Sequence, residues 1–183
     1  MTNVKMTIEE IAKQHKFCFI CAGVLEYKEK NLLICTKCGY HKYINPVPCN
    51  GALLKNSKGE ILLIERRIDP MKGYWDFPGG FVDLDENIEE SMARELKEET
   101  DLTIVDLKYF CSEYDIYTYD GITFPTLGSI FTGTIPDGQE ITVHDDVASY
   151  KFFEPSKLPF DKLAFKSVEK ALKTLIAENA IDL

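Results

Sequence analysis

The sequence lacks any apolar run of eighteen or more residues, and its first sixteen residues contain no apolar segment of the kind that directs export. The first absence excludes a helical membrane span, and the second predicts a cytoplasmic protein. Cations are also scarce, because 21 Lys and Arg residues stand against 30 Asp and Glu residues, giving a net charge of −9. Broad nucleic-acid binding needs a cationic surplus, so this composition disfavours it.

The composition that remains is typical of a globular protein. Hydrophobic residues make up 45% of the 183 positions, which is enough for one substantial core and a small appendage. Internal repeats and low-complexity tracts are absent. We therefore expect one main domain with a minor one attached.

A helix is predicted in the middle of the chain, and its acidic residues are unusually placed. Its buried stripe is formed by Ile88, Met92 and Leu96. At about 100° per residue, Glu95 and Glu99 fall within or at the edge of this stripe, with Glu98 and Arg94 just beyond. Carboxylates at a core boundary cost several kcal/mol unless they are paired or bind a metal. Clustered oxygen ligands suit Mg²⁺ or Mn²⁺. The alternative is a charged surface helix whose apolar and charged positions follow the helical repeat imperfectly.

A glycine turn precedes this helix and favours the metal interpretation. Gly79 and Gly80 follow Trp75-Asp76-Phe77-Pro78, and glycines are needed where backbone adopts positive φ or closely approaches a ligand. Residues 80–102 resemble the signature of the Nudix hydrolases, whose charged positions recur here with the family's spacing. The signature positions are filled by Gly80, Glu86, Arg94, Glu95, Leu96, Glu98, Glu99 and Leu102. Asp101 replaces the second glycine, where we expect a small stability penalty because Asp tolerates the αL conformation at some cost.

The resemblance implies both a fold and a chemistry. The implied fold is α+β, an α/β/α sandwich with a mixed sheet. The implied reaction is divalent-metal-dependent hydrolysis of a pyrophosphate linkage in a nucleoside diphosphate bound to another group, such as ADP-ribose, NAD(H) or a related dinucleotide. The implied metal ligands are Glu95, Glu98, Glu99 and the carbonyl of Gly80. Arg94 would orient Glu95 by a charge-assisted bond, with Glu86 as its second partner.

Four cysteines near the start of the chain form two CxxC pairs. They are Cys18, Cys21, Cys35 and Cys38, with thirteen residues between the pairs. This spacing predicts a structural zinc ribbon, whose filled coordination shell argues against catalysis at the zinc. Two disulfides or four buried cysteines are the alternatives, and the absence of an export segment disfavours disulfides. Cys49 and Cys111 have no such partners and are expected to pack as small apolar residues.

The general base and the substrate contacts are less sharply defined by the sequence. In the family, the base is a carboxylate either on the helix or on a later loop, and the loop candidates here are Asp145 and Asp146. Ordinary solvated turn chemistry is the alternative for these two aspartates. Arg66 and Arg67 end a strand that leads to the glycine turn, and because strand residues alternate faces we expect only one to meet phosphate.

Aromatic residues are dense between residues 109 and 128. Tyr117 and Phe124, with Tyr114 and Tyr119, offer a surface for stacking a nucleobase, and cross-strand aromatic pairs are the alternative. The order of ribbon, Asn45-Pro46 connector and signature helix looks like the zinc-ribbon branch of the family, which includes NADH pyrophosphatases. Those enzymes carry a motif of the form SQPWPFPxS after the helix, and its absence here counts against NADH as the favoured substrate.

A coarse assignment of elements completes the expected architecture. A capping box at residues 7–10 predicts a helix to about residue 15. Strands are predicted at residues 51–54, 61–65, 103–111, 127–135 and 149–153, with a hairpin turn at 56–59, and a closing helix at 163–177. We expect an N-terminal helix and zinc ribbon at residues 1–44 and a Nudix hydrolase domain at 45–183.

Two classes of function fit these expectations. The first is an enzyme acting on a small nucleotide, with ADP-ribose or a related dinucleotide as leading candidates. The second is a non-catalytic nucleotide- or protein-binding module on the same fold. A binding module has no need of the full Arg94, Glu95, Glu98 and Glu99 set, so the enzyme is favoured. Dimers are frequent in the family, and a homodimer is therefore a possible assembly.

Overall fold

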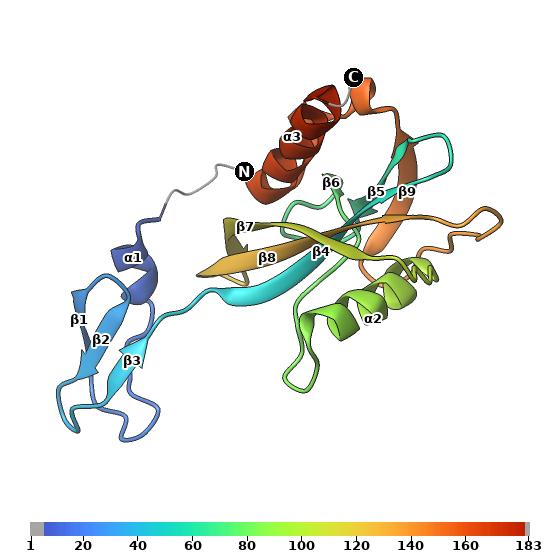
Figure 1. Cartoon of the computed structure of the whole chain (residues 1–183). Helices are drawn as coiled ribbons and strands as arrows, with labels where there is room; N and C mark the ends of the chain where they lie inside the picture. Colours follow the sequence, from blue (N-terminus) through green and yellow to red (C-terminus); the bar gives the residue numbers. More distant parts are fainter. Residues whose placement is uncertain (1–5, 182–183) are drawn as a thin grey trace. The chain divides into compact units, whose positions relative to one another are not determined.

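The computed structural model describes residues 6–181 of the chain (Figure 1). It divides into two compact units, Met1–Val47 with Ile116–Pro125, and Pro48–Asp115 with Thr126–Leu183. The expected domain boundary between residues 44 and 45 stays a prediction. The first five residues of the expected N-terminal domain and residues 182–183 of the expected catalytic domain lie outside the described residues.

The first unit contains a short helix and a small antiparallel sheet. Helix α1 (Ile8–Ala12) precedes β1 (Leu25–Glu29), β2 (Leu32–Cys35) and β3 (His41–Tyr43), which pair in that order. The capping box is confirmed, since the amide of Glu10 donates to Thr7 Oγ1 at 3.2 Å and the amide of Thr7 donates to Glu10 Oε2 at 2.7 Å. The helix ends before His15, because the amides of Gln14 and His15 bond to carbonyls three residues back and tighten the chain into a turn.

The second unit is built on a six-stranded sheet, with strand order β6-β5-β4-β8-β7 and β9 paired to β5, while the end of the β7–β8 hairpin, Ile116–Pro125, belongs to the first unit. The strands are β4 (Val47–Lys55), β5 (Ile61–Arg66), β6 (Trp75–Asp76), β7 (Lys108–Tyr119), β8 (Ile122–Thr134) and β9 (Val147–Phe153). The helices are α2 (Ile88–Thr100) and α3 (Lys166–Ile181), with 3₁₀ turns at Pro155–Lys157 and Phe160–Lys162. Within residues 6–181, no helix has the length and apolar character needed to cross a membrane.

Alternating side chains place a hydrophobic core on each face of this sheet. Leu53 and Leu63 pack in a cluster with Val168 and Leu172 of α3. Their strand neighbours Leu54 and Leu62 point the other way, into a cluster that includes Met92 and Leu96 of α2. Figure 1 shows α2 and α3 on opposite sides of the sheet. The expected α/β/α sandwich with a mixed sheet is therefore confirmed.

The strands of the central hairpin differ from the sequence-based expectation. Strand β7 begins at Lys108 instead of Thr103 and continues to Tyr119, while β8 begins at Ile122 instead of Leu127. Thr103 lies before β7, where the side-chain amide of Gln139 bonds to both its backbone groups, at 3.1 and 2.9 Å. A side chain thus takes the place of a neighbouring strand, a contact between residues far apart in the sequence.

Candidate active site

Helix α2 places its acidic residues as the sequence predicts. Met92 and Leu96 are buried, and Glu99 is buried beside them with an exposed fraction of 8%. The helix begins after Asn87, whose side chain accepts from the amide of Glu90 at 2.9 Å while Glu90 Oε2 accepts from the amide of Asn87 at 2.9 Å. This capping box fixes where the helix starts and so which residues face the core.

The glycine turn is held against β4 by backbone hydrogen bonds. The amide of Asn50 donates to the carbonyl of Gly80 at 2.8 Å, and the amide of Ala52 donates to the carbonyl of Pro78 at 2.9 Å. Gly79 has φ of 144°, and a Cβ atom there would lie 2.4 Å from the carbonyl oxygen of Asn50. Only glycine fits this position, because the turn packs directly against the backbone of β4.

Glu95 lies against the second glycine of this turn. A Cβ atom on Gly80 would lie 2.5 Å from Glu95 Oε1 and 2.9 Å from Glu95 Oε2. Burial raises the pKa of Glu95, while the hydrogen bond from Arg94 opposes that rise. The absence of a side chain at residue 80 therefore lets a carboxylate reach the backbone of the turn.

Arg94 connects the acidic residues of the site. Its Nε and Nη2 donate to the two oxygens of Glu86, at 2.9 and 2.5 Å, and this bidentate contact is the main reason that the pKa of Glu86 falls to about 2. Its Nη1 donates to Glu95 Oε1 at 2.8 Å and to Glu98 Oε2 at 3.0 Å. These are the contacts expected of an orienting arginine, and its role in catalysis stays a prediction.

Glu99 is the most perturbed carboxyl of the helix. Its Oε2 accepts a hydrogen bond from the amide of Gly79 at 2.8 Å. Burial raises the pKa of Glu99 to about 8; the hydrogen bond from Gly79 opposes this rise, and the charges of Glu95 and Asp76 add to it. A buried carboxyl in this environment gains its charge readily only when a cation is bound beside it. Glu99 therefore fits a divalent-metal site.

The three glutamates do not converge on a single point. Glu95 and Glu98 turn toward the same nitrogen of Arg94, whereas Glu99 turns toward Gly79. In the described part of the chain, the four cysteines are the one group of potential ligand side chains whose ligand atoms all lie within 4.8 Å of one another. A metal ion shared by all three glutamates would therefore require Glu98, whose side chain is 51% exposed, to leave Arg94.

The acidic loop lies at the end of the same helix. The amide of His144 donates to the carbonyl of Glu99 at 3.1 Å, and the amide of Thr142 donates to the carbonyl of Thr100 at 3.2 Å. These bonds satisfy carbonyls that the end of an α-helix leaves without partners. Asp145 and Asp146 follow directly and are exposed. The loop candidates for the general base are therefore anchored beside Glu99, and their role stays a prediction.

Asp101 takes the αL conformation expected of the family glycine, with φ of 60°. Its carboxylate accepts from Lys97 Nζ at 2.8 Å and lies 2.8 Å from His144 Nε2. Both contacts lower the pKa of Asp101, the one with Lys97 most. The residue that departs from the family signature thus connects α2 to the acidic loop.

Arg66 is the last residue of β5, and Arg67 follows directly after the strand. Arg66 Nη1 donates to Asp76 Oδ2 at 3.1 Å, Nε donates to the carbonyl of Pro70 at 2.8 Å, and the guanidinium lies 5.2 Å from the ring centre of Phe165. Burial raises the pKa of Asp76 to about 6, opposed by the charge of Arg66. Arg67 is exposed. Arg67 is therefore the more accessible of the two cations, and which one meets substrate stays a prediction.

Tyr117 and Phe124 lie opposite one another on β7 and β8. Their ring centres are 5.5 Å apart with planes inclined by 43°, which is the geometry of a cross-strand aromatic pair. Both residues belong to the unit that contains the cysteines, while the glutamates belong to the other unit. A substrate contact for these two rings stays a prediction.

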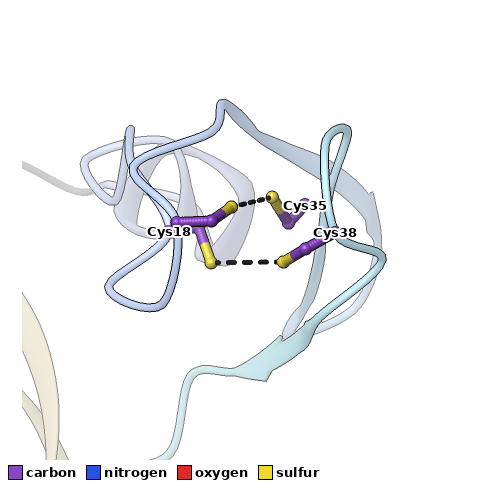
Figure 2. A group of neighbouring side chains, drawn as sticks. Cys18, Cys35 and Cys38 are labelled. Carbon is purple, nitrogen blue, oxygen red and sulfur yellow. Dashed lines mark hydrogen bonds between the residues drawn. The ribbon is translucent and has the colours of Figure 1, made fainter.

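The four cysteines of the ribbon form a compact cluster (Figure 2). Cys18 Sγ lies 3.8 Å from Cys38 Sγ, and Cys21 Sγ lies 3.5 Å from Cys35 Sγ. Four sulfurs bound to one ion at about 2.3 Å are separated by about 3.8 Å in a tetrahedron, so the cluster fits a metal site. All six cysteines are free, which contradicts the disulfide alternative. Backbone amides of Cys38 and Lys37 lower the pKa of Cys35 to about 6, while hydrogen bonds with the other cysteines and burial outweigh the amide of Tyr40 and raise the pKa of Cys38 to about 12, so an ion that binds all four sulfurs displaces protons from the cluster.

Two residues near the site were missed from the sequence. Asn50 and Ser91 are buried, and Asn50 Nδ2 donates to Ser91 Oγ at 2.8 Å. Asn50 Oδ1 also lies 3.4 Å from the amide of Gly80. The sequence contained one signal for this pair, because Asn50 is a polar residue directly before the apolar run of β4. This pair joins β4, α2 and the glycine turn.

Comparison with known proteins agrees with the geometry. The model of the NUDIX domain matches residues 46–175. The chain belongs to the Nudix family. This Nudix chain is 39% identical over 137 residues to an ADP-ribose pyrophosphatase of Methanocaldococcus jannaschii, covering 73% of the chain and 75% of the relative. It is 31% identical over 185 residues to the NAD-capped RNA hydrolase NudC of Haemophilus influenzae strain PittEE, covering 96% and 67% respectively.

A further match and a solved structure extend this comparison. The match to NudC of Haemophilus influenzae strain PittGG spans only 41% of that relative's length. A NUDIX hydrolase from Nitrosomonas europaea has the same fold, with a TM-score of 0.64, 24% identity, and coverage of 86% of this chain and 88% of that one. These comparisons thus support the family and the fold of the residues that they match.

Proposed function

We propose that this Nudix chain hydrolyses the pyrophosphate linkage of a nucleoside diphosphate bound to another group, with ADP-ribose as the leading substrate. The observation that carries the proposal is the buried carboxyl of Glu99, which lies against the glycine turn within an acidic set organised by Arg94. A purely structural helix gains nothing from a carboxyl whose pKa burial raises to about 8. The M. jannaschii relative, named an ADP-ribose pyrophosphatase, supports the choice of substrate.

The metal ligands proposed are Glu95, Glu98, Glu99 and the carbonyl of Gly80, holding Mg²⁺ or Mn²⁺. When bound, the ions supply positive charge that stabilises the phosphoryl oxygens and lowers the pKa of a bound water. Arg94 holds Glu95 in place and neutralises part of the acidic cluster before metal binding. Gly80 carries no side chain, which leaves room for Glu95 beside the backbone of the turn.

The remaining roles follow from position. Asp146, or Asp145 beside it, is proposed to take the proton of the attacking water, since the loop is anchored to the end of α2 through His144. A helix glutamate is the alternative base. Arg67, with Arg66 as the alternative, is proposed to bind a phosphate of the substrate. Tyr117 and Phe124 are proposed to contact its nucleobase.

Zinc is the ion proposed for the four cysteines, because their number and spacing match its tetrahedral thiolate coordination. A reducing cytoplasm is the compartment in which such thiolates persist. A homodimer stays a prediction from the resemblance. Low affinity for nucleic acid also stays a prediction, and the named activity of the NudC relatives makes NAD-capped RNA a necessary member of any substrate panel.

The test is turnover of a panel of ADP-ribose, NADH and NAD-capped RNA, with and without Mg²⁺, by wild type, Glu98→Gln and Glu89→Gln. Glu89 is exposed in the first turn of the same helix and serves as the matched control. We expect Mg²⁺-dependent turnover, with ADP-ribose preferred, a loss of about a hundredfold or more in Glu98→Gln, and none in Glu89→Gln. If wild type turns over no substrate, or Glu98→Gln matches it, the binding-module alternative replaces the enzyme for this panel.

A further inference from the structure

The side chain of Gln14 joins the ribbon's helix to the end of the β7–β8 hairpin. Its Nε2 donates to the carbonyl of Thr123 at 2.7 Å, and its Oε1 accepts from the amide of Thr123 at 2.9 Å. The same Nε2 lies 3.2 Å from the carbonyl of Ile11, which fixes the amide's orientation. The two residues are 109 positions apart. The glutamine amide thus pairs with β8 as the backbone of a neighbouring strand would.

The position of Gln14 depends on the core of the ribbon. Gln14 follows α1, whose Ile11 and Ala12 are buried. Ala12 packs in a cluster with Leu25, Leu33 and two of the four clustered cysteines, Cys18 and Cys35. This core is too small to be stable without help, and in such domains the energy of metal binding is largely the energy of folding. The placement of Gln14 therefore depends on the cysteine cluster being closed.

The hairpin end that Gln14 contacts belongs to the ribbon's unit. Residues Ile116–Pro125 group with Met1–Val47 and not with the remainder of their own strands. Asp120 and Gly121 form the turn, both with positive φ, at 47° and 78°. Thr123 is buried with an exposed fraction of 5%, and its Oγ1 lies 3.0 Å from Thr118 Oγ1. The contact with Gln14 thus lies at a buried residue of the hairpin end.

We propose that the ribbon acts as a metal-dependent brace, meaning that metal binding to the ribbon orders this hairpin end. Gln14 is the residue that connects the two. Closing the cysteine cluster orders α1, α1 presents the amide of Gln14, and that amide holds Thr123 and the register of residues 116–125. Because Tyr117 and Phe124 lie on this segment, the brace also orders the aromatic pair. This last step rests on the proposed function, whereas the bracing of the hairpin does not.

The test measures amide hydrogen exchange across the full chain, without substrate, before and after removal of the ribbon metal. In the loaded wild type we expect Thr123 and its hairpin neighbours to be protected. Metal removal should raise exchange at residues 17–40 and, by about tenfold, at residues 116–125, since two ordinary hydrogen bonds together contribute about this much. If exchange at residues 116–125 stays unchanged while exchange at residues 17–40 rises, the proposal is wrong.

Variants separate the Gln14 contact from general loss of the ribbon. Gln14→Met keeps the length of the side chain but cannot make either bond, so in the loaded protein it should raise hairpin exchange about tenfold while leaving residues 17–40 protected. Gln14→Glu keeps the acceptor but loses the donor and should give a smaller increase. Equal protection of the hairpin in Gln14→Met and wild type would refute the role of Gln14, whatever the effect of the metal.

The chain offers a matched control in Gln139. Its amide makes the same two bonds with Thr103, at 3.1 and 2.9 Å, in the other unit. Gln139→Met should raise exchange at Thr103 alone and should not alter the response of residues 116–125 to the metal. If the aromatic pair contacts substrate as proposed, Gln14→Met should raise KM for ADP-ribose severalfold with kcat unchanged. Normal KM with a loosened hairpin would refute only that substrate contact.

Discussion

Replacing Glu99 with glutamine tests the central electrostatic feature of the site. Glu99 is 8% exposed, and burial raises its pKa from an ordinary 4.5 to about 8. Between these two values the unfolded chain is ionised and the folded chain holds the proton, so unfolding releases a proton. The free energy of unfolding therefore falls as pH rises through this window. Below about pH 4.5 the penalty is absent, and above about pH 8 it is complete.

The expected magnitude follows from this pKa gap. Each pKa unit corresponds to about 1.4 kcal/mol, so the gap sets an upper limit of about 5 kcal/mol on the penalty. Glutamine has nearly the same shape, carries no charge, and its carbonyl can accept the bond from Gly79 that Glu99 accepts at 2.8 Å. We expect Glu99→Gln to match wild type within about 1 kcal/mol at pH 5 and to exceed it by about 2–4 kcal/mol at pH 8.5.

Urea unfolding in buffer without Mg²⁺ or Mn²⁺, with the ribbon metal retained, measures this difference. Glu89→Gln is the control, since Glu89 is exposed on the same helix and this variant retains Glu99, so its stability should fall with pH as that of wild type does. Added Mg²⁺ should stabilise wild type in proportion to its affinity but leave Glu99→Gln nearly unchanged. Parallel stability curves for wild type and Glu99→Gln between pH 5 and 8.5 would show that burial does not hold this carboxyl neutral.

Two further substitutions test the local geometry. Gly80→Ala places a Cβ atom 2.5 Å from Glu95 Oε1, the movable end of a side chain. We expect turnover to fall at least about tenfold while stability changes by about 1 kcal/mol or less, and an active variant with normal kcat would refute the need for this close approach. Asp101→Gly relieves the αL strain but removes the half-exposed contacts with Lys97 and His144. These effects oppose each other, so the free energy of unfolding measured in urea should differ from that of wild type by about 1 kcal/mol or less. A loss of stability above about 2 kcal/mol would contradict this expectation.

Helix α2 shows what periodicity alone can predict. The stripe of Met92 and Leu96 placed Glu99 at the core boundary, and the structure buries it there. The CxxC spacing likewise predicted a four-cysteine cluster. Both predictions succeeded because the decisive sequence pattern is local, within one helix or within each of the two CxxC turns, even though the sulfur contacts join one turn to the other. The contacts of Arg94 followed from the family signature, since the residues it bonds lie on or just before its own helix.

The parts that the sequence did not predict depend on contacts between distant residues. Thr103 lies before β7 and bonds to Gln139, and Thr123 lies within β8 and bonds to Gln14. A glutamine that replaces a strand has no signature of its own, since its neighbours give no hint of its partner. The same reason explains why Asn50 was missed, as its partner Ser91 lies on α2.

Both candidate metal sites of this chain hold groups that must lose a proton when an ion binds, and this predicts how binding depends on pH. In the ribbon, backbone amides lower the pKa of Cys35 to about 6, whereas the pKa of Cys38 rises to about 12 because hydrogen bonds with the other cysteines and burial outweigh the amide of Tyr40. On α2, burial raises the pKa of Glu99 to about 8, so binding an ion near neutral pH must also release a proton. We therefore expect both sites to bind their ions more strongly as pH rises, the ribbon to hold its ion through purification by four thiolates, and the oxygen ligands at α2 to let their ion exchange readily.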